Sequence, residues 1–190
     1  MTRLAALFAV LASASGTVLA CGMEDGASVA FRRGALQLAY PEALHVGTAV
    51  WQAQLADQLP RDPVATRADL SPEERGALRL SRADALLDRL SASVSTAPSG
   101  AGHPGVSIVL VGPVHWSRLE IHDGVAQAQV HVDGPEDDDV VLVTELPVVE
   151  AIVEGRLDFA RAIERGLARL YGPAAQTAAA RRWLTRGAGG

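Results

Sequence analysis

Histidine is the residue type in this chain best suited to hold a transition metal, because a neutral imidazole nitrogen is a common zinc ligand. The five histidines form no HxH, HxxxH or HExxH pair, and the single cysteine, Cys21, is distant from them in sequence. His115 is expected on the strand face that it shares with Ser117, His122 in a hairpin turn, and His131 on the polar face of the next strand. This pattern does not bring the histidines together. The sequence therefore predicts surface or turn histidines, with no metal site and no cofactor.

Nucleophilic and acid–base catalysis find no better support in the sequence. The GxSxG turn that presents a nucleophilic serine in hydrolases is absent. Ser107 and Ser117 are close to His115 along the chain, but closeness in sequence does not make a triad. Glu145 and Glu150 form a carboxylate pair without a supporting motif. We therefore predict that the protein is not an enzyme.

Charge excludes another class of function. All 17 basic residues are Arg, the formal net charge is −5, and no basic run reaches five residues, which argues against nucleic-acid binding. The acidic run PEDDD at 135–139 could attract Ca²⁺, but it lacks the interleaved ligands and the glycine of an EF-hand loop. A solvated acidic loop is the plainer interpretation.

The first twenty residues are typical of a secretory signal. A short positive start, MTR, precedes the apolar run LAALFAVLASASG and the small residues that lead to Cys21. The sequence VLAC resembles a bacterial lipobox, in which the cysteine is lipidated, and the alternative is cleavage by ordinary signal peptidase. We expect an exported periplasmic protein anchored to the bacterial membrane through Cys21. A single cysteine cannot form an intrachain disulfide.

The segments that follow predict an α+β fold. Hydrophobic residues make up 48% of the chain and aromatic residues 4%, so the core must consist mainly of Ala, Val and Leu. Residues 22–40 show no clean period, whereas an apolar stripe after Pro41 favours a helix. A capping box at Ser71 and Glu74 predicts a second helix over 72–91. The Asp-Gly turn after His122 predicts a hairpin among four or five mostly antiparallel strands.

The last third of the chain is organised by glycines. A helix that begins at Pro147 should end at Gly155, where a positive φ is readily adopted. Asp158 should cap a short helix that ends at Gly166, and a short edge strand and a final helix follow. Six apolar residues are expected to face one space beside the sheet: Ile152, Leu157, Phe159, Ile163, Leu167 and Leu170.

This arrangement resembles the C-terminal half of the sterol carrier protein type-2 family. The resemblance covers residues 83–185 and rests on Gly155-Arg156-Leu157-Asp158, Ala162, Gly166-Leu167, Arg169 and Gly172. It implies a five-stranded sheet covered by helices, with an apolar tunnel for a lipid or sterol and no catalytic residues. The chain departs from the family in its export signal and in the extra helical segment at 41–60. The expected organisation is a signal peptide at 1–20, an N-terminal helical extension and linker at 21–70, and the family-like domain at 71–186.

The sequence thus favours a non-enzymatic protein that binds an apolar ligand, such as a lipid, a fatty acyl chain or a sterol-like or hopanoid-like molecule. Two alternatives stay open: a periplasmic scaffold or assembly factor that keeps the fold without a ligand, and a metal-handling accessory protein. Sequence names no protein partner, and it cannot tell a filled core from a cavity, since both are lined by apolar groups. The candidate cavity residues are Leu119, Val130, Val132, Val141, Val143, Ile152, Leu157, Phe159, Ile163, Leu167 and Leu170.

Overall fold

The computed structural model describes residues 26–94, 104–122 and 125–187. The predicted signal peptide, Cys21 and the Asp-Gly turn of the hairpin lie outside these residues. Within the described ranges no helix is long and apolar enough to cross a membrane.

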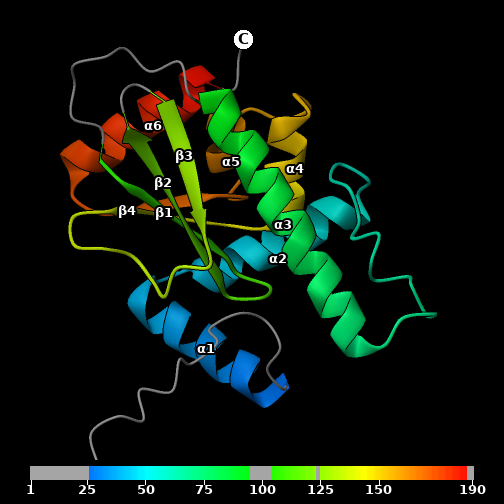
Figure 1. The fold of residues 1–190 in the computed structure, drawn as a ribbon. Coiled ribbons are helices and arrows are strands. Elements are labelled where there is room, and N and C mark those ends of the chain that lie inside the picture. Colours follow the sequence, from blue (N-terminus) through cyan, green and yellow to red (C-terminus); the bar gives the residue numbers. More distant parts are fainter. Residues whose placement is uncertain (1–25, 95–103, 123–124, 188–190) are drawn as a thin grey trace, which may run out of the picture.

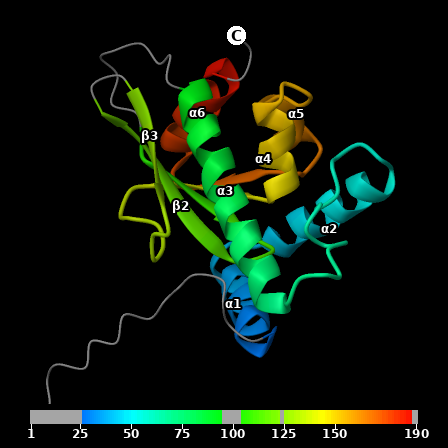
Figure 2. The same cartoon turned by 45° about the vertical axis from the view of Figure 1, so that its right-hand side comes forward.

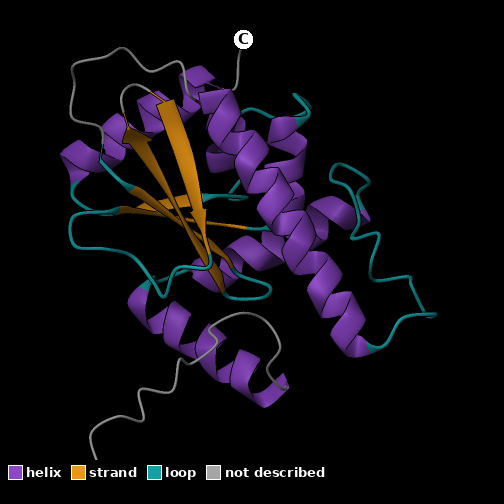
Figure 3. Cartoon of the chain, viewed as in Figure 1, coloured by secondary structure: helices purple, strands orange, loops and turns teal. Residues whose placement is uncertain are grey.

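A five-stranded sheet forms the centre of the α+β fold, as the sequence predicts (Figures 1 and 3). Its order is β3-β2-β1-β4-β5, and every neighbouring pair is antiparallel except β1 and β4, which run parallel. The central strands β1 and β4 are apolar and buried along their whole length, whereas β2 and β3 alternate, as expected for strands with one wet face. The strands are β1 (Val106–Leu110), β2 (His115–His122), β3 (Val125–Val130), β4 (Val140–Thr144) and β5 (Arg169–Tyr171).

Helices precede and follow the sheet in the chain. In Figures 1 and 2 α1 lies at one end of the molecule, α5 and α6 lie toward the other, and the long α3 extends between these ends. Helix α3 packs against β3, α4 and α6. The helices are α1 (Gly26–Ala39), α2 (Ala43–Leu55), α3 (Pro72–Val94), α4 (Leu146–Val153), α5 (Phe159–Glu164) and α6 (Ala174–Gly187).

Local signals set several helix ends where the sequence predicts them. The Glu74 backbone N–H donates to Ser71 Oγ at 3.2 Å, and the Ser71 N–H donates to Glu74 Oε2 at 2.7 Å, which completes the capping box at the start of α3. The Arg161 N–H donates to Asp158 Oδ1 at 2.8 Å at the start of α5. These bonds satisfy backbone N–H groups that have no partner inside the helix.

Gly155 ends α4 in the left-handed conformation expected of it, with φ of 71°. Its N–H donates to the Ile152 carbonyl, and the next N–H, of Arg156, donates to the Ala151 carbonyl. This pair of bonds is the Schellman arrangement, which satisfies carbonyls at the helix end. The turn lets the chain reverse at once into the segment that leads to α5.

Helix α1 is the element that the sequence did not reveal. Residues 22–40 show no apolar period, and in the structure Phe31 and Leu38 project into solvent while Leu36 is buried. Its apolar residues are therefore not all directed at the core. Arg33 of this helix donates to the Val111 and Gly112 carbonyls, which attaches the helix to the β1–β2 turn.

The N-terminal helices share one hydrophobic core with the sheet. Ala43, Val46 and Val50 of α2 belong to the same buried cluster as the strands and the C-terminal helices. Between α1 and α2, the ring of Tyr40 meets Tyr171 edge-on at a centroid distance of 5.3 Å. Helix α2, in the segment 21–70 that was expected as an extension, thus packs against β4 and contributes to the shared core.

Candidate functional site

A largely apolar hollow lies between the N-terminal helices and one end of the sheet. Two adjoining spaces, of about 500 and 560 Å³, share Arg33, Gly47, Trp51 and Glu145, and together they form what we call the N-terminal cleft. These volumes are within the range of small-molecule sites, about 300–1,000 Å³. Apolar lining comes from α1, α2, α3, the β1–β2 turn and the start of α4: Val29, Leu44, Val50, Trp51, Leu80, Ala83, Leu110, Val111, Pro113, Leu146 and Pro147.

Glu145 is the titratable group at the base of this cleft. It directly follows β4 and is the N-cap residue of α4, but its side chain makes no capping hydrogen bond. The carboxyl instead lies beside Gly47 of α2 and Gly112 of the β1–β2 turn, the latter a backbone hydrogen-bond partner. Burial raises the pKa of Glu145 to about 7, against smaller opposing effects of the Gly112 bond and the Arg33 charge. A carboxyl that titrates near neutrality in a cleft marks a candidate functional site.

Arg33 attaches α1 to the rim of the cleft. Its Nε donates to the Gly112 carbonyl at 3.0 Å and to the Val111 carbonyl at 3.3 Å. Arg79 and Arg82 also line the cleft: Arg79 pairs with Asp62 at 2.6 Å, and Arg82 pairs with Glu150. The arginines that line the cleft are thus hydrogen-bonded to carbonyls or paired with carboxylates, beside a largely apolar lining.

None of the eleven residues predicted from sequence to line a cavity borders this cleft. Four of the eleven are half-buried: Val130, Val132, Ile163 and Leu170. Two of these, Ile163 and Leu170, border a separate hollow of about 520 Å³ between α5, β5 and α6, whose lining includes the charged Glu164, Arg169 and Arg181. The remaining seven lie in the packed core: Leu119, Val141, Val143, Ile152, Leu157, Phe159 and Leu167.

Two of the histidines come together, contrary to the sequence-based expectation. The rings of His115 and His131 lie 4.8 Å apart between centroids, nearly perpendicular, and Asp84 of α3 adjoins both. His122 stays apart and pairs with Glu120 on the same strand, at 2.6 Å. The expectation failed at His131, because β3 ends at Val130 and His131 has a left-handed φ of 62°.

The chain forms a bulge at this point. Val130 pairs with Ser117, but the next bond to β2 comes from the Val132 N–H to the Trp116 carbonyl, so His131 and Val132 both lie opposite Trp116. A bulge re-aims a side chain, and this one turns His131 from the polar face of the strand toward Asp84. The strand alternation seen in sequence carries no signal for such an insertion.

Ser117, His115 and Asp84 superficially resemble a catalytic triad but lack its geometry. The Ser117 Oγ lies 3.2 Å from His115 Nε2, and the nearest Asp84 oxygen lies 3.9 Å from the same nitrogen. In a triad the carboxylate holds the other ring nitrogen. Burial lowers the pKa of His115, which favours the neutral imidazole over the charged one.

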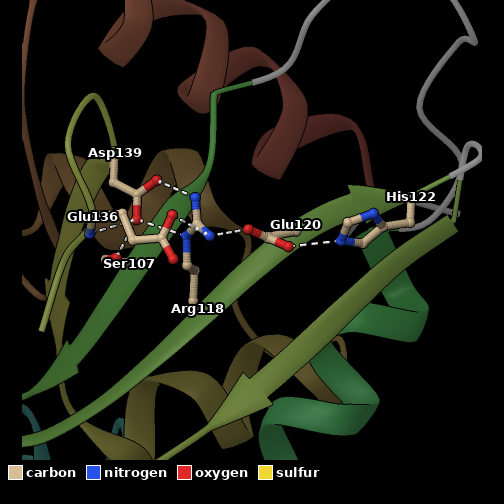
Figure 4. Close-up of polar contacts among 6 residues, drawn as sticks. All are labelled: Ser107, Arg118, Glu120, His122, Glu136 and Asp139. Carbon is tan, nitrogen blue, oxygen red and sulfur yellow. Dashed lines mark hydrogen bonds and ion pairs between the residues drawn. The ribbon is translucent and has the colours of Figure 1, made fainter. Parts of the chain in front are cut away.

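A second polar cluster fastens the acidic loop 131–139 to the sheet (Figure 4). Arg118 of β2 makes a bidentate pair with Asp139, with Nε to Oδ2 at 2.9 Å and Nη2 to Oδ1 at 3.0 Å. Ser107 of β1 donates to Asp139 Oδ2 at 2.6 Å, and Glu136 contacts Arg118 at 2.7 Å. The Asp139 carboxylate is thus committed to protein partners, which supports a structural role for this part of the acidic run rather than a Ca²⁺ site.

Comparisons with known proteins identify neighbours by fold. No protein-family model matches the chain, and no curated protein matches it. The similar solved structures include sterol carrier protein 2. That match has 22% sequence identity and a TM-score of 0.39, and it covers 57% of this chain and 93% of the other. Sterol carrier protein 2 like 2 from Aedes aegypti matches at 18% identity and a TM-score of 0.40, over 55% of this chain and 97% of its own.

A further match is the stereoselective inverting sec-alkylsulfatase Pisa1 from Pseudomonas sp.. It has 22% identity and a TM-score of 0.38 over 53% of this chain, and this chain covers only 15% of that enzyme. The family that the glycine pattern resembles is therefore among the structural neighbours for a little more than half of the chain. The prediction that this protein is not an enzyme stays a prediction.

Proposed function

We propose that this protein is an exported, membrane-anchored binder of an amphiphile with an apolar chain, which lies in the N-terminal cleft. It performs no covalent chemistry in this proposal. The observation that carries it is that exposed apolar side chains concentrate on the three N-terminal helices, α1, α2 and α3, which supply much of the cleft lining. Of the seven large hydrophobic residues that are exposed within the described ranges, six belong to α1, α2 and α3: Phe31, Leu38, Leu44, Trp51, Leu55 and Leu78.

Two of these exposed side chains border the cleft itself, where a ligand could cover them. Trp51, with 59% of its surface exposed, lines both parts of the cleft, and Leu44 lines the outer part. An acyl chain in the cleft would cover these side chains and gain about 25 cal/mol for each Å² of apolar surface removed from water. The same helices would face a lipid surface while the ligand enters.

The proposed lipid anchor at Cys21 would place the N-terminal helices next to the membrane. Cys21 precedes the start of α1 at Gly26 by five residues. Lipidation at Cys21 would therefore hold α1 and its exposed Phe31 close to the membrane surface. The export signal, the lipidation and the cleft ligand form one proposal, but each has its own test.

Tryptophan quenching tests the ligand. A dibrominated stearic acid quenches a tryptophan only when the bromine atoms lie close to it. Trp51 lines the cleft, whereas the other two tryptophans do not: Trp116 of β2 is partly buried beside Tyr40, and Trp183 is buried in α6 and donates to the Val94 carbonyl at 2.9 Å. We expect saturable quenching at one acid per chain, lost in Trp51→Phe, and competition by stearate or by cholesterol tells a linear chain from a rigid ring system.

A pair of matched variants locates the site. Gly47→Leu places a large side chain in the cleft, because a Cβ at this position already meets Glu145 and Val111 at 3.6 and 3.8 Å. Gly34→Leu on α1 is the control, since nothing lies within 4 Å of a Cβ there. Gly47→Leu should weaken binding at least about tenfold, or about 1.4 kcal/mol, while Gly34→Leu binds normally. Equal binding by both variants, or no saturable quenching in the parent, contradicts the cleft and favours the scaffold alternative.

Fractionation tests the anchor separately. Cys21→Ser removes the acylated atom and should move the protein from the membrane fraction to the periplasmic fraction of the producing bacterium. An unchanged distribution contradicts the lipoprotein proposal and leaves the cleft proposal standing.

A further inference from the structure

The cluster of Asp84, His115 and His131 lies apart from the N-terminal cleft and has no role in the proposed function. Three distant segments supply it: the middle of α3, the first residue of β2 and the bulge that follows β3. Within the described ranges these are the residues whose nitrogen and oxygen atoms gather in a way that could hold a metal ion. Their arrangement calls for an explanation, because it brings two imidazoles and a carboxylate to one point.

The distances fit a single metal ion. Asp84 Oδ2 lies 3.1 Å from His131 Nε2, Asp84 Oδ1 lies 3.9 Å from His115 Nε2, and one ligand atom from each residue lies within 4.8 Å of the others. Zinc bonds to nitrogen and oxygen at about 2.0–2.2 Å, so ligand atoms at tetrahedral corners are about 3.4 Å apart. The observed separations between ligand atoms lie on both sides of this value, so small rotations of the three side chains would bring the atoms to the corners of a tetrahedron.

An unsatisfied carboxylate oxygen points to the same conclusion. Asp84 Oδ1 is buried and has no hydrogen-bond partner among the described residues. A buried acceptor left without a partner is destabilising, and such groups are rare in folded proteins. The free oxygen is the one that faces His115, on the side where an ion would lie. A bound cation would satisfy it.

The surroundings leave room for a further ligand. His115 is almost fully buried and fixed against the sheet, whereas the side chains of Asp84 and His131 are 31% and 34% exposed. Two imidazoles and one carboxylate with an open side match the donor set of zinc sites that keep a position for water. Imidazole donors favour zinc-like transition metals over Ca²⁺ and Mg²⁺, which prefer oxygen ligands.

We propose that Asp84, His115 and His131 bind one Zn²⁺ ion, with at least one coordination position open to water or to an anionic ligand. The ion links α3 to β2 and to the bulge after β3. The sequence spacing alone conceals the site, because its ligands are 31 and 16 residues apart along the chain.

Metal titration tests this proposal directly. The full chain carrying Cys21→Ser, which removes the single thiol, is titrated with Zn²⁺ against a chromophoric chelator. We expect one Zn²⁺ per chain, and Co²⁺ at the same stoichiometry with the intense visible absorption of a low-coordinate site. His131→Ala and Asp84→Asn should each weaken binding by about 100-fold or more, beyond the 10- to 100-fold typical of residues that only support a ligand.

The controls separate ligation from misfolding. His122→Ala removes an exposed histidine of the same hairpin and should bind Zn²⁺ as the parent does. Asp84→Asn keeps the size of the side chain, so it should fold as the parent does, which circular dichroism checks. Absence of one-equivalent binding in the parent overturns the proposal. So does equal affinity in the parent and the two cluster variants.

Discussion

Glu145 makes the stability of the fold depend on pH in a way that a single substitution can expose. Burial raises the pKa of this carboxyl from its ordinary 4.5 to about 7 in the folded protein. As pH rises through this window, the unfolded chain loses the proton first and is stabilised relative to the folded chain. The contribution of Glu145 to the free energy of unfolding therefore falls between about pH 4.5 and 7.

The size of the effect follows from the two values. A shift of one pKa unit corresponds to about 1.4 kcal/mol. The rise in the pKa of Glu145 from 4.5 to about 7 therefore limits its effect on the free energy of unfolding to about 3 kcal/mol. The cleft admits solvent near the carboxyl, which reduces the expected effect to about 2 kcal/mol. Glu145→Gln keeps the shape of the side chain and cannot ionise. It should match the parent near pH 4.5 and exceed it by about 2 kcal/mol at pH 8, or about 4–8 °C in Tm.

Urea unfolding followed by circular dichroism at pH 4.5, 6 and 8 measures this difference. Other titrating groups contribute equally to parent and variant, so only the difference between the two curves matters. Glu154→Gln is the matched control, because Glu154 is an exposed residue at the end of α4 whose partner is Arg156. A difference between Glu145→Gln and the parent that does not change with pH, or that is largest at pH 4.5, would refute the assignment of Glu145.

Three further substitutions test the packing by urea unfolding. Gly105→Ala should lower the free energy of unfolding by about 2–4 kcal/mol, because the new Cβ would lie 2.1 Å from Asp139 Oδ1 and disrupt the pair between Asp139 and Arg118. A variant as stable as the parent would contradict this close contact. Asp158→Ala should cost about 1 kcal/mol through loss of the cap on α5, and no change would contradict the capping bond. Gly47→Ala should gain about 0.5–1 kcal/mol, because its Cβ meets no atom closer than 3.6 Å within a helix. A loss of stability there would show that the cleft wall cannot accept a methyl group.

Features that depend on neighbours in sequence were the ones that sequence could predict. The capping box at Ser71, the cap at Asp158 and the reversal at Gly155 each involve residues within a few positions, and each is confirmed. The buried strands were equally visible, since a run of β-branched residues such as 140–144 suits a strand covered on both faces. Local chemistry thus sufficed for the α+β class and most of its elements.

The candidate sites were not predictable in the same way, because their residues converge from distant segments. The cleft joins Arg33, Trp51, Arg79, Gly112 and Glu145, and no periodicity in the chain links these positions. The histidine cluster depends on one extra residue in a strand, which reverses where a side chain points. Each site is a product of tertiary packing.

The loop between β3 and β4 has a consequence for the order in which the protein folds. The sheet order places β3 at an edge, so this loop must pass β2 and β1 before β4 pairs in parallel with β1. Asp139, the last residue of the loop, is bound by Arg118 of β2 and Ser107 of β1. These contacts need β1 and β2 to lie side by side, because Ser107 and Arg118 are opposite each other in the β1–β2 pair. We therefore expect the local antiparallel pairing of β1 with β2 to form before the parallel pairing of β1 with β4.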